Sequence, residues 1–356
     1  MRILHVDTAL SWRGGQNQVL LAARGMAARG HAVAVACRRG GALETRVREA
    51  GIDTFPIGVR RDIAPLGVLG LARAMGAFRP DVAQLHDPHA VGAGLMASRL
   101  RGGARLIATR RVDFPLRGAF SRRKYTSCRR VIAVSRAVAG VLEEGGVSAE
   151  RLRVVYEGVP DRPAAGGGAE ALAALGVPPG SLVVGNVAAL AEHKDHATLL
   201  ESAPRVLRRV PEACFVIVGD GELRPRLEAR ARELGLGGRW ILADFRTDID
   251  RLLPAFSIFC LSSQQEGLGT SLLDAMNFAL PVVATAAGGI PEAVEDGVSG
   301  RLVPPRDPEA LAESLVSLLL QADLRAAMGR AGRRRFEARF SDERMVGETL
   351  RVFEES

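Results

Sequence analysis

The stretch "SSQQEGLGTSLLDAMNFALPVVATAAGGIPE", from Ser262 to Glu292, contains the pattern that decides our interpretation of the fold. The preceding "FSIFCL" is short and apolar, as in a buried strand, and "SLLDAMNFAL" predicts a helix that stops at Pro281. A glycine turn joins the two. Free backbone N–H groups and the helix dipole favour negative charge at such a turn. Because Glu266 and Asp274 flank it, we expect a ligand that carries both phosphate and hydroxyl groups, as a sugar phosphate or a nucleotide does.

The same alternation of apolar strands and helices continues on both sides of this stretch. It predicts parallel sheets covered by helices on both faces, because parallel strands require crossover connections. The glycine-, alanine- and proline-rich segment 161–181 separates two such series and has the composition of a linker. The predicted strands of the first series are 2–7, 31–37, 81–86, 104–109 and 130–135, and those of the second are 182–188, 214–220, 239–245, 256–261, 281–285 and 300–304.

We therefore expect an α/β protein with two tandem Rossmann-like domains, each a doubly wound parallel sheet. The first domain is expected over residues 1–160 and the second over residues 161–341. A final helix over 342–356 has no strand after it, and we expect it to return and pack on the first domain. Ligands of such folds bind at the carboxyl ends of the strands, so the active site is expected in the interdomain cleft.

The composition favours a fully folded protein without a membrane span. The chain has 356 residues, 47% of them hydrophobic, and no apolar run reaches the roughly 18 residues of a spanning helix. It starts on a strand pattern rather than a signal peptide, so a cytoplasmic location is expected. The cysteines lack metal-site spacing and are expected to be buried free thiols; they are Cys37, Cys128, Cys214 and Cys260.

Charge is distributed unevenly between the two halves of the chain. Residues 1–160 hold 26 basic and 12 acidic residues, a net of +14, and residues 161–356 hold 22 and 28, a net of −6. The densest basic segment, Arg110 to Arg130, has eight basic residues and Asp113 as its one acid. It could attract nucleic acid, an anionic membrane surface or an acidic substrate. General arginine enrichment is the alternative, because 46 of the 48 basic residues are arginine.

Two shorter segments also have features of a phosphate site. Gly14 and Gly15 follow the first strand, where glycine lets a backbone approach a phosphate closely. The G-x-G-x-x-G pattern is missing, which disfavours a dinucleotide site. Lys194, the one lysine after residue 160, precedes a helix; it is either a phosphate partner or a solvated loop residue. His193 and His196 flank it without an evident third ligand, so no metal site is expected.

Taken in this order, these segments resemble the retaining glycosyltransferases of family 4, which have the two-domain GT-B architecture. The resemblance covers nearly the whole chain and is strongest from Leu182 to Ala310. It depends on "GGQNQVLLAARGMAARGHAVAV", "VIAVSRAVAGVLEEGGVSAERLRVVYEGV", "VGDGELRPRLEARARELGL" and the opening stretch with its continuation "AVEDGVSGRLVPPRDPEALAESL".

The resemblance implies roles for individual residues. The family's E-x7-E element falls on Glu266, which would face the donor sugar, and Asp274, which would hold the ribose. The implied donor-binding residues are Gly15, Lys194, Phe245, Arg246, Glu266, Gly267, Leu268, Gly269, Thr270, Ser271, Leu272 and Asp274. The implied catalytic residues are Glu266, Lys194 and Arg111, and the implied acceptor-binding residues are His86, Arg110 and Arg111.

The chain departs from the family pattern at three positions. Asp274 is one methylene shorter than the usual glutamate, Ala189 replaces an arginine that contacts the diphosphate, and Arg111 replaces a histidine. These changes affect the expected ribose contact, the charge on the leaving group and the choice of donor or acceptor.

We expect an enzyme that moves a sugar from a nucleotide diphosphate, UDP or GDP, onto an acceptor with retention and without a metal or other cofactor. The basic first half favours a lipopolysaccharide, lipid-linked or other cell-envelope acceptor and peripheral association with a membrane. The alternatives are a catalytically weakened nucleotide-sugar-binding protein and a sugar-nucleotide epimerase. Nucleic acid is not expected as a partner, because aromatic residues make up 4% of the chain.

Overall fold

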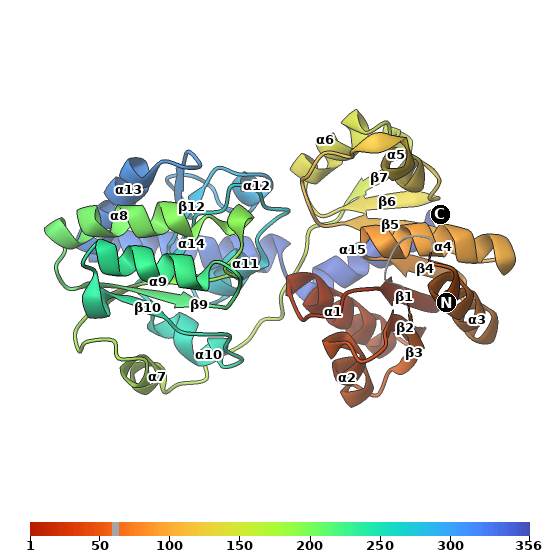
Figure 1. Cartoon of the computed structure of the whole chain (residues 1–356), viewed down its shortest axis with the longest axis horizontal. Helices are drawn as coiled ribbons and strands as arrows, with labels where there is room; N and C mark the ends of the chain where they lie inside the picture. Colours follow the sequence, from red (N-terminus) through yellow and green to blue (C-terminus); the bar gives the residue numbers. More distant parts are fainter. Residues whose placement is uncertain (59–63) are drawn as a thin grey trace. The chain divides into compact units, whose positions relative to one another are not determined.

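The computed structural model describes residues 1–58 and 64–356, and it divides into two compact units (Figure 1). Unit 1 comprises residues 1–159 and 341–356, and unit 2 comprises residues 160–340. The chain leaves unit 1 after Val159 and rejoins it at Ser341. Unit 1 is therefore discontinuous in sequence.

Unit 1 is built on a seven-stranded parallel sheet in the order β3-β2-β1-β4-β5-β6-β7. Strand β1 pairs with β2 on one side and with β4 on the other, so that Leu4 lies opposite Ala34 and Ala83. The chain adds strands outward from β1 on one side and then on the other, which places the topological switch point between β1 and β4. The strands are β1 (Arg2–Asp7), β2 (Ala32–Arg38), β3 (Asp53–Ile57), β4 (Val82–Leu85), β5 (Arg105–Arg110), β6 (Arg130–Ala133) and β7 (Leu152–Val154).

Helices connect successive strands of this sheet, as parallel pairing requires. The α-helices of unit 1 are α1 (Gly14–Ala28), α2 (Ala42–Glu49), α3 (Pro65–Phe78), α4 (Pro88–Leu100), α5 (Gly118–Thr126), α6 (Arg136–Glu144) and α15 (Asp342–Glu354). A 3₁₀ turn, η1 (Ala149–Arg151), precedes β7.

Unit 2 repeats the plan with a six-stranded parallel sheet in the order β10-β9-β8-β11-β12-β13, whose switch point lies between β8 and β11. Its strands are β8 (Leu182–Val187), β9 (Ala213–Val218), β10 (Trp240–Leu242), β11 (Ile258–Leu261), β12 (Val282–Thr285) and β13 (Gly300–Val303). Its helices are α7 (Gly168–Ala174), η2 (Glu192–Lys194), α8 (His196–Arg209), α9 (Arg224–Glu233), η3 (Gly237–Arg239), α10 (Ile249–Leu252), η4 (Leu253–Ala255), α11 (Thr270–Asn277), α12 (Ile290–Ala293), α13 (Pro308–Leu320) and α14 (Ala322–Arg339).

Short polar side chains start several of these helices. The Asp87 carboxylate accepts from the backbone N–H groups of His89 and Ala90 at 2.9 and 3.0 Å, and Pro88 follows at the first helical position of α4. Asp307 and Pro308 begin α13 in the same way. The carboxylate satisfies N–H groups that have no partner within the helix, and proline loses nothing there because its missing N–H would be unpaired.

Helix α15 completes the core of unit 1. Its residues Val346 and Phe353 are buried in one apolar cluster with Ile3 of β1 and Met26 of α1. A Cβ built on Gly25 of α1 would lie 2.7 Å from Val346 Cγ2, so glycine allows the two helices to approach closely. Each buried apolar side chain of this size contributes roughly 1.5–3 kcal/mol.

The predicted fold class, two tandem doubly wound parallel-sheet α/β domains, is confirmed. Three details differ from the sequence predictions. The two edge strands of unit 1 were not predicted: β3 contains Pro56, which an edge strand tolerates, and β7 has three residues. Helix α7 lies within the segment predicted as a linker.

All four cysteines are buried free thiols, as predicted. Burial raises the pKa of Cys37 and of Cys128 to about 12, so both remain protonated at neutral pH. Within residues 1–58 and 64–356, no helix is long and apolar enough to cross a membrane.

Two glycines of α14 provide a test of how this helix packs on α11 and on the turn that follows it. A Cβ on Gly329 would lie 1.9 Å from the carbonyl oxygen of Ala279, whereas one on Gly332 would lie 3.5 Å from Met276 Cγ, an ordinary contact. We expect Gly329→Ala to lower the free energy of unfolding by about 1–3 kcal/mol, because the backbone must move. Gly332→Ala is the control and should be neutral or stabilising by up to about 1 kcal/mol, since alanine favours helix. Urea unfolding of both variants measures the difference, and equal effects would contradict the close packing.

Candidate active site

An ion pair at the carboxyl edge of the unit 2 sheet joins two predicted site residues. Lys194 ends η2, which follows β8, and Glu266 lies after β11, so the two flank the switch point of the sheet. The Lys194 Nζ atom pairs with Glu266 Oε2, and the two side chains are 19% and 13% exposed. The Ser263 hydroxyl donates to the same carboxylate oxygen at 3.3 Å. The structure therefore holds a cation and a carboxylate together where ligands of such sheets bind.

Backbone contacts fix the two loops that carry this pair. The N–H of Gln264 donates to the carbonyl of His193 at 2.8 Å, and the Ser262 hydroxyl donates to the carbonyl of Asp195 at 2.9 Å. Asp195 has a positive φ of 47° and caps α8 by accepting from Thr198. These contacts connect the loop after β8 to the loop after β11, so Lys194 and Glu266 are held by their backbones as well as by each other.

The glycine turn after Glu266 leads into α11. Gly269 caps this helix with a φ of 89°, and a Cβ there would lie 2.9 Å from Leu272 Cδ1, so only glycine fits without strain. Leu268 and Leu272 are buried in the core, whereas Thr270 and Ser271 remain partly accessible. A glycine cap supplies no side-chain acceptor for the first N–H groups of α11, which suits an anion at this end.

Asp274 lies one turn into α11 and is held by an arginine. Its Oδ1 atom pairs with Arg162, whose other terminal nitrogen pairs with Asp250 of α10 at 2.9 Å. The Asp274 side chain is 16% exposed. Burial raises the pKa of Asp274 to about 6, Arg162 opposes this rise, and Asp250 adds to it. Asp274 is therefore easier to protonate than an ordinary aspartate.

The remaining predicted donor residues of unit 2 lie in the loop after β10. The Phe245 ring is 58% exposed, which leaves its face open to a planar ligand. Arg246 forms a two-armed ion pair with Asp248, at 2.8 and 2.6 Å. His196, which flanks Lys194 in the sequence, is buried and bonds Asn186 at 3.1 Å. Among the described residues, no group of three or more histidines, cysteines and acids is placed to hold a metal ion.

In unit 1, three of the predicted residues meet at the carboxyl edge of the sheet. The Arg111 guanidinium forms an ion pair with Glu157 at 2.8 Å and donates to the backbone carbonyl of His86 at 3.2 Å. A Cβ on Gly15 would lie 3.7 Å from Arg111 Cδ, so the glycine leaves room beside this side chain. Arg111 thus links the segment after β5 to the segments after β4 and β7 and to the start of α1.

Two of the four predicted residues of unit 1, His86 and Arg110, are buried. His86 Nε2 lies 2.9 Å from His5 Nδ1, and burial together with Arg111 lowers the pKa of both rings, that of His5 to about 3. Both histidines are therefore neutral at physiological pH. Arg110 is 5% exposed, and its guanidinium bonds the Tyr125 hydroxyl at 3.2 Å rather than joining Arg111.

Asp7, Glu157 and Arg162 are among the residues near these clusters that were not predicted. Asp7, at the end of β1, could have been found because polar residues that end central parallel strands commonly face a ligand site. Glu157 and Arg162 gave no local signal, because their partners lie 46 and 112 residues away.

A hollow of about 570 Å³ opens at the amino edge of the unit 1 sheet, opposite the edge that carries the predicted residues. It is lined by Arg105, Arg129 and Arg130 among others, and it contains none of the predicted site residues. Its size does not make it the site, because ligands of doubly wound sheets bind at the carboxyl edge.

Comparison with known proteins agrees with this two-part organisation. Residues 12–162 match the profile described as Glycosyltransferase Family 4, and residues 169–335 match the profile described as Glycosyl transferases group 1. Together the two profiles span most of the chain. The protein belongs to the family 4 glycosyltransferases, which confirms the resemblance seen in the sequence.

Individual relatives match over part of their length. The D-inositol 3-phosphate glycosyltransferase of Saccharomonospora viridis is 32% identical over 59% of this chain and 54% of its own. The lipopolysaccharide core biosynthesis glycosyltransferase LpsE of Rhizobium meliloti is 29% identical over 51% of this chain and 52% of its own. The chain thus spans about half the length of these curated relatives.

Solved structures match over the whole chain. The Anabaena protein Alr3699/HepE, crystallised with UDP and glucose, has a TM-score of 0.89 and 22% identity and covers 100% of both chains. At this level of identity the likeness shows a common fold.

The buried carboxylate of Asp7 makes a specific prediction about stability and pH. Burial, followed by the charge of Asp87, raises the pKa of Asp7 to about 6, although its carboxylate accepts from Ala9 N–H at 3.0 Å and from Gln16 Nε2 at 3.1 Å. The folded state therefore binds this proton more tightly than the unfolded state does. Stability from this group is fully present below the unfolded pKa of 3.8 and is lost as pH rises through 6.

We expect Asp7→Asn to remove this loss, which amounts to roughly 3 kcal/mol for a shift of about two pKa units. Urea unfolding of the wild type and the variant at several pH values between about 4 and 7 measures the difference in stability. The difference should change in favour of the variant as pH rises. A difference that is constant with pH would show that Asp7 has an ordinary pKa.

Proposed function

We propose that this protein is a retaining glycosyltransferase that takes a sugar from a UDP- or GDP-linked donor and transfers it to a cell-envelope glycan or lipid-linked acceptor. The observation that carries the proposal is the Lys194–Glu266 pair beside the glycine turn at the switch point of unit 2. Family membership and the UDP bound to the structurally similar HepE support it.

Each part of this site suits one part of a nucleotide sugar. The Lys194 ammonium and the N–H groups at the start of α11 would face the diphosphate, whose negative charge grows as the bond to the sugar breaks. Glu266 would accept hydrogen bonds from the sugar hydroxyls and Asp274 from the ribose. Because Lys194 and Glu266 pair with each other in the ligand-free protein, the donor would exchange this ion pair for two new contacts. Neither partner would be left buried and alone at any stage.

The same residues account for chemistry with retention. The leaving diphosphate, held by Lys194, would accept the proton of the acceptor hydroxyl as that oxygen attacks the same face of the sugar. Arg111 of unit 1 would contact the acceptor. The relatives named for D-inositol 3-phosphate and for lipopolysaccharide core support an acceptor that carries negative charge. Arg111, 15% exposed, would supply a positive partner for it.

A nucleotide-sugar-binding protein with little activity is the second candidate. Ala189 supports it, because the alanine lies in the loop after β8 and, by the resemblance to the family pattern, takes the place of an arginine that contacts the diphosphate. Donor turnover separates the two candidates, since a binding protein would be stabilised by the donor without releasing the nucleoside diphosphate.

The proposed donor site predicts how two substitutions affect transfer. After thermal-shift screening of UDP-, GDP-, ADP- and CMP-linked sugars has identified the donor, Lys194→Ala and Glu266→Gln should each reduce transfer about 100-fold. Loss of one preorganised charged contact costs on the order of 3 kcal/mol in the transition state. Glu313→Gln, which breaks the exposed pair with Arg209, is the matched control and should retain activity. Wild-type turnover in both folded site variants would refute the site.

We also propose that α5 and the loop before it attach unit 1 to an anionic membrane surface. Arg117, Arg122 and Arg123 are exposed there, and the nearby Phe114 and Phe120 rings are 39% and 51% exposed. Arginines and aromatic rings on one surface suit the boundary between lipid headgroups and acyl chains. Lys124 does not contribute to this surface, because it is buried and donates to the carbonyl of Pro88 at 2.9 Å.

Vesicle binding tests this surface. Changing Arg117, Arg122 and Arg123 together to serine should weaken co-sedimentation with phosphatidylserine vesicles roughly 100-fold, because each arginine contributes about 1 kcal/mol. The control carries the same change in charge in unit 2, at the exposed Arg205, Arg208 and Arg209. Equal loss in both triple variants, or equal binding of the wild type to neutral vesicles, would exclude a specific membrane surface.

A further inference from the structure

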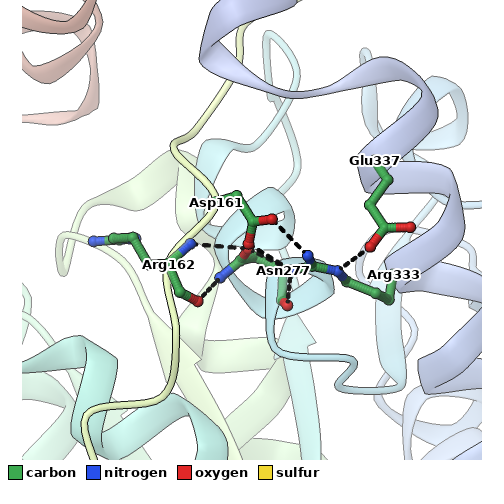
Figure 2. Close-up of polar contacts among 5 residues, drawn as sticks. All are labelled: Asp161, Arg162, Asn277, Arg333 and Glu337. Carbon is green, nitrogen blue, oxygen red and sulfur yellow. Dashed lines mark hydrogen bonds and ion pairs between the residues drawn. The ribbon is translucent and has the colours of Figure 1, made fainter.

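The segment that starts unit 2, at Asp161 and Arg162, is hydrogen-bonded to helices α11 and α14 (Figure 2). Arg333 of α14 reaches Asp161 with two bonds of 2.9 and 2.7 Å and contacts both the carbonyl and the side-chain oxygen of Asn277 at 2.7 Å. Asn277 Nδ2 in turn donates to the carbonyl of Arg162 at 3.0 Å. Glu337 holds the other side of Arg333 at 2.7 Å. The backbone of Arg162 is therefore fixed relative to α11.

From this fixed backbone, the Arg162 side chain extends to two carboxylates. It pairs with Asp274 Oδ1, and it reaches Asp250 at 2.9 Å. The side chains of Arg162 and Asp274 are 28% and 16% exposed. Within the described residues, the second oxygen of Asp274, Oδ2, makes no hydrogen bond or ion pair. One oxygen is thus occupied by the arginine, and the other remains available.

The proposed function assigns Asp274 to the ribose of the donor, and the following inference rests on that assignment. We propose that Arg162 is a positioning residue for nucleotide recognition: it holds the Asp274 carboxylate in one orientation, so that Oδ2 accepts hydrogen bonds from the ribose hydroxyls. A glutamate would bring its carboxylate one methylene further from the helix. The shorter aspartate has less reach and more need of a partner that fixes its direction.

Electrostatics gives Arg162 a second effect on the same contact. A protonated carboxyl has one acceptor fewer, so the ribose contact requires the ionised form of Asp274. Arg162 favours that form and Asp250 opposes it. The two groups therefore shift the ionisation of Asp274 in opposite directions, and their removal should have opposite effects on nucleotide binding.

Calorimetric titration with UDP and with 2′,3′-dideoxyuridine 5′-diphosphate isolates the ribose contact. Arg162→Gln should weaken UDP binding about tenfold, since a hydrogen bond to a charged group contributes about 1.5 kcal/mol or more. It should leave binding of the dideoxy nucleotide within about twofold. Arg162→Lys keeps the charge but loses the two-armed geometry, and should fall between the wild type and Arg162→Gln.

The pH dependence provides a second readout that a purely structural role would not change. In Arg162→Gln the pKa of Asp274 should rise, so UDP binding should recover as pH increases from about 6 to 8. In Asp250→Asn the pKa should fall, so UDP binding should persist to lower pH than in the wild type. Arg333→Gln loosens the same segment without touching Asp274; it should lower the unfolding temperature yet keep the difference between UDP and the dideoxy nucleotide.

The outcomes distinguish this inference from the function on which it rests. If the wild type binds neither UDP nor GDP, the proposed function fails and the role of Arg162 fails with it. If the wild type binds UDP and Arg162→Gln binds it equally well, only the role of Arg162 is refuted. If Arg162→Gln weakens the binding of UDP and of the dideoxy nucleotide equally, Arg162 stabilises the fold and does not position Asp274 for the ribose.

Discussion

The carboxyl ends of all strands in a parallel sheet lie at the same edge. This constraint brings the residues of the candidate donor site together. In unit 2 the strand order reverses between β8 and β11, so the segments that follow these two strands diverge from a common point. Lys194 comes from one of these segments and Glu266 from the other, 72 residues later. No other long-range contact is needed to bring Lys194 and Glu266 together. Their backbones are already adjacent once β8 and β11 pair, and Gln264 and Ser262 complete the connection.

Paired charges recur at several of the predicted ligand contacts. Lys194 pairs with Glu266, Arg162 with Asp274 and Arg111 with Glu157, and each pair is largely shielded from water. Such pairs add little to stability, because removal of the charges from water offsets most of their attraction. Apolar residues would pack in these places at lower cost. The presence of charged residues at these positions is therefore better explained by ligand binding than by folding.

The sequence predicted the sheets well because most strands are continuous apolar runs. It missed both edge strands of unit 1: β3, where Asp53 and Pro56 interrupt the pattern, and β7, which has three residues. It also missed α7, whose glycines and alanines resembled a linker. Edge strands and small exposed helices are stabilised mainly by their neighbours, so their own composition carries a weak signal.

Residues next to a recognisable turn could be proposed as site residues from the sequence, whereas their partners that are distant in sequence could not. Glu266 follows from the glycine turn and Lys194 from its position before α8, but nothing near Arg162 indicates that it meets Asp274. The count of charges in the basic segment also overestimated how many of its side chains are exposed. Arg110 and Lys124 belong to a basic run, yet both are buried and satisfied by neighbouring oxygen atoms. Periodicity shows which face a residue occupies only after the helix or strand has been placed against its neighbours.

The discontinuity of unit 1 has a consequence for synthesis on the ribosome. Residues 160–340 form a continuous segment and can fold as soon as they emerge, whereas unit 1 must wait for α15. Until then the cluster around Ile3 and Met26 lacks Val346 and Phe353, and its apolar surface stays exposed while more than half of the chain is being made. Synthesis of unit 1 thus begins before that of unit 2 and is completed after it. The incomplete form of unit 1 is the species most exposed to aggregation and to capture by chaperones.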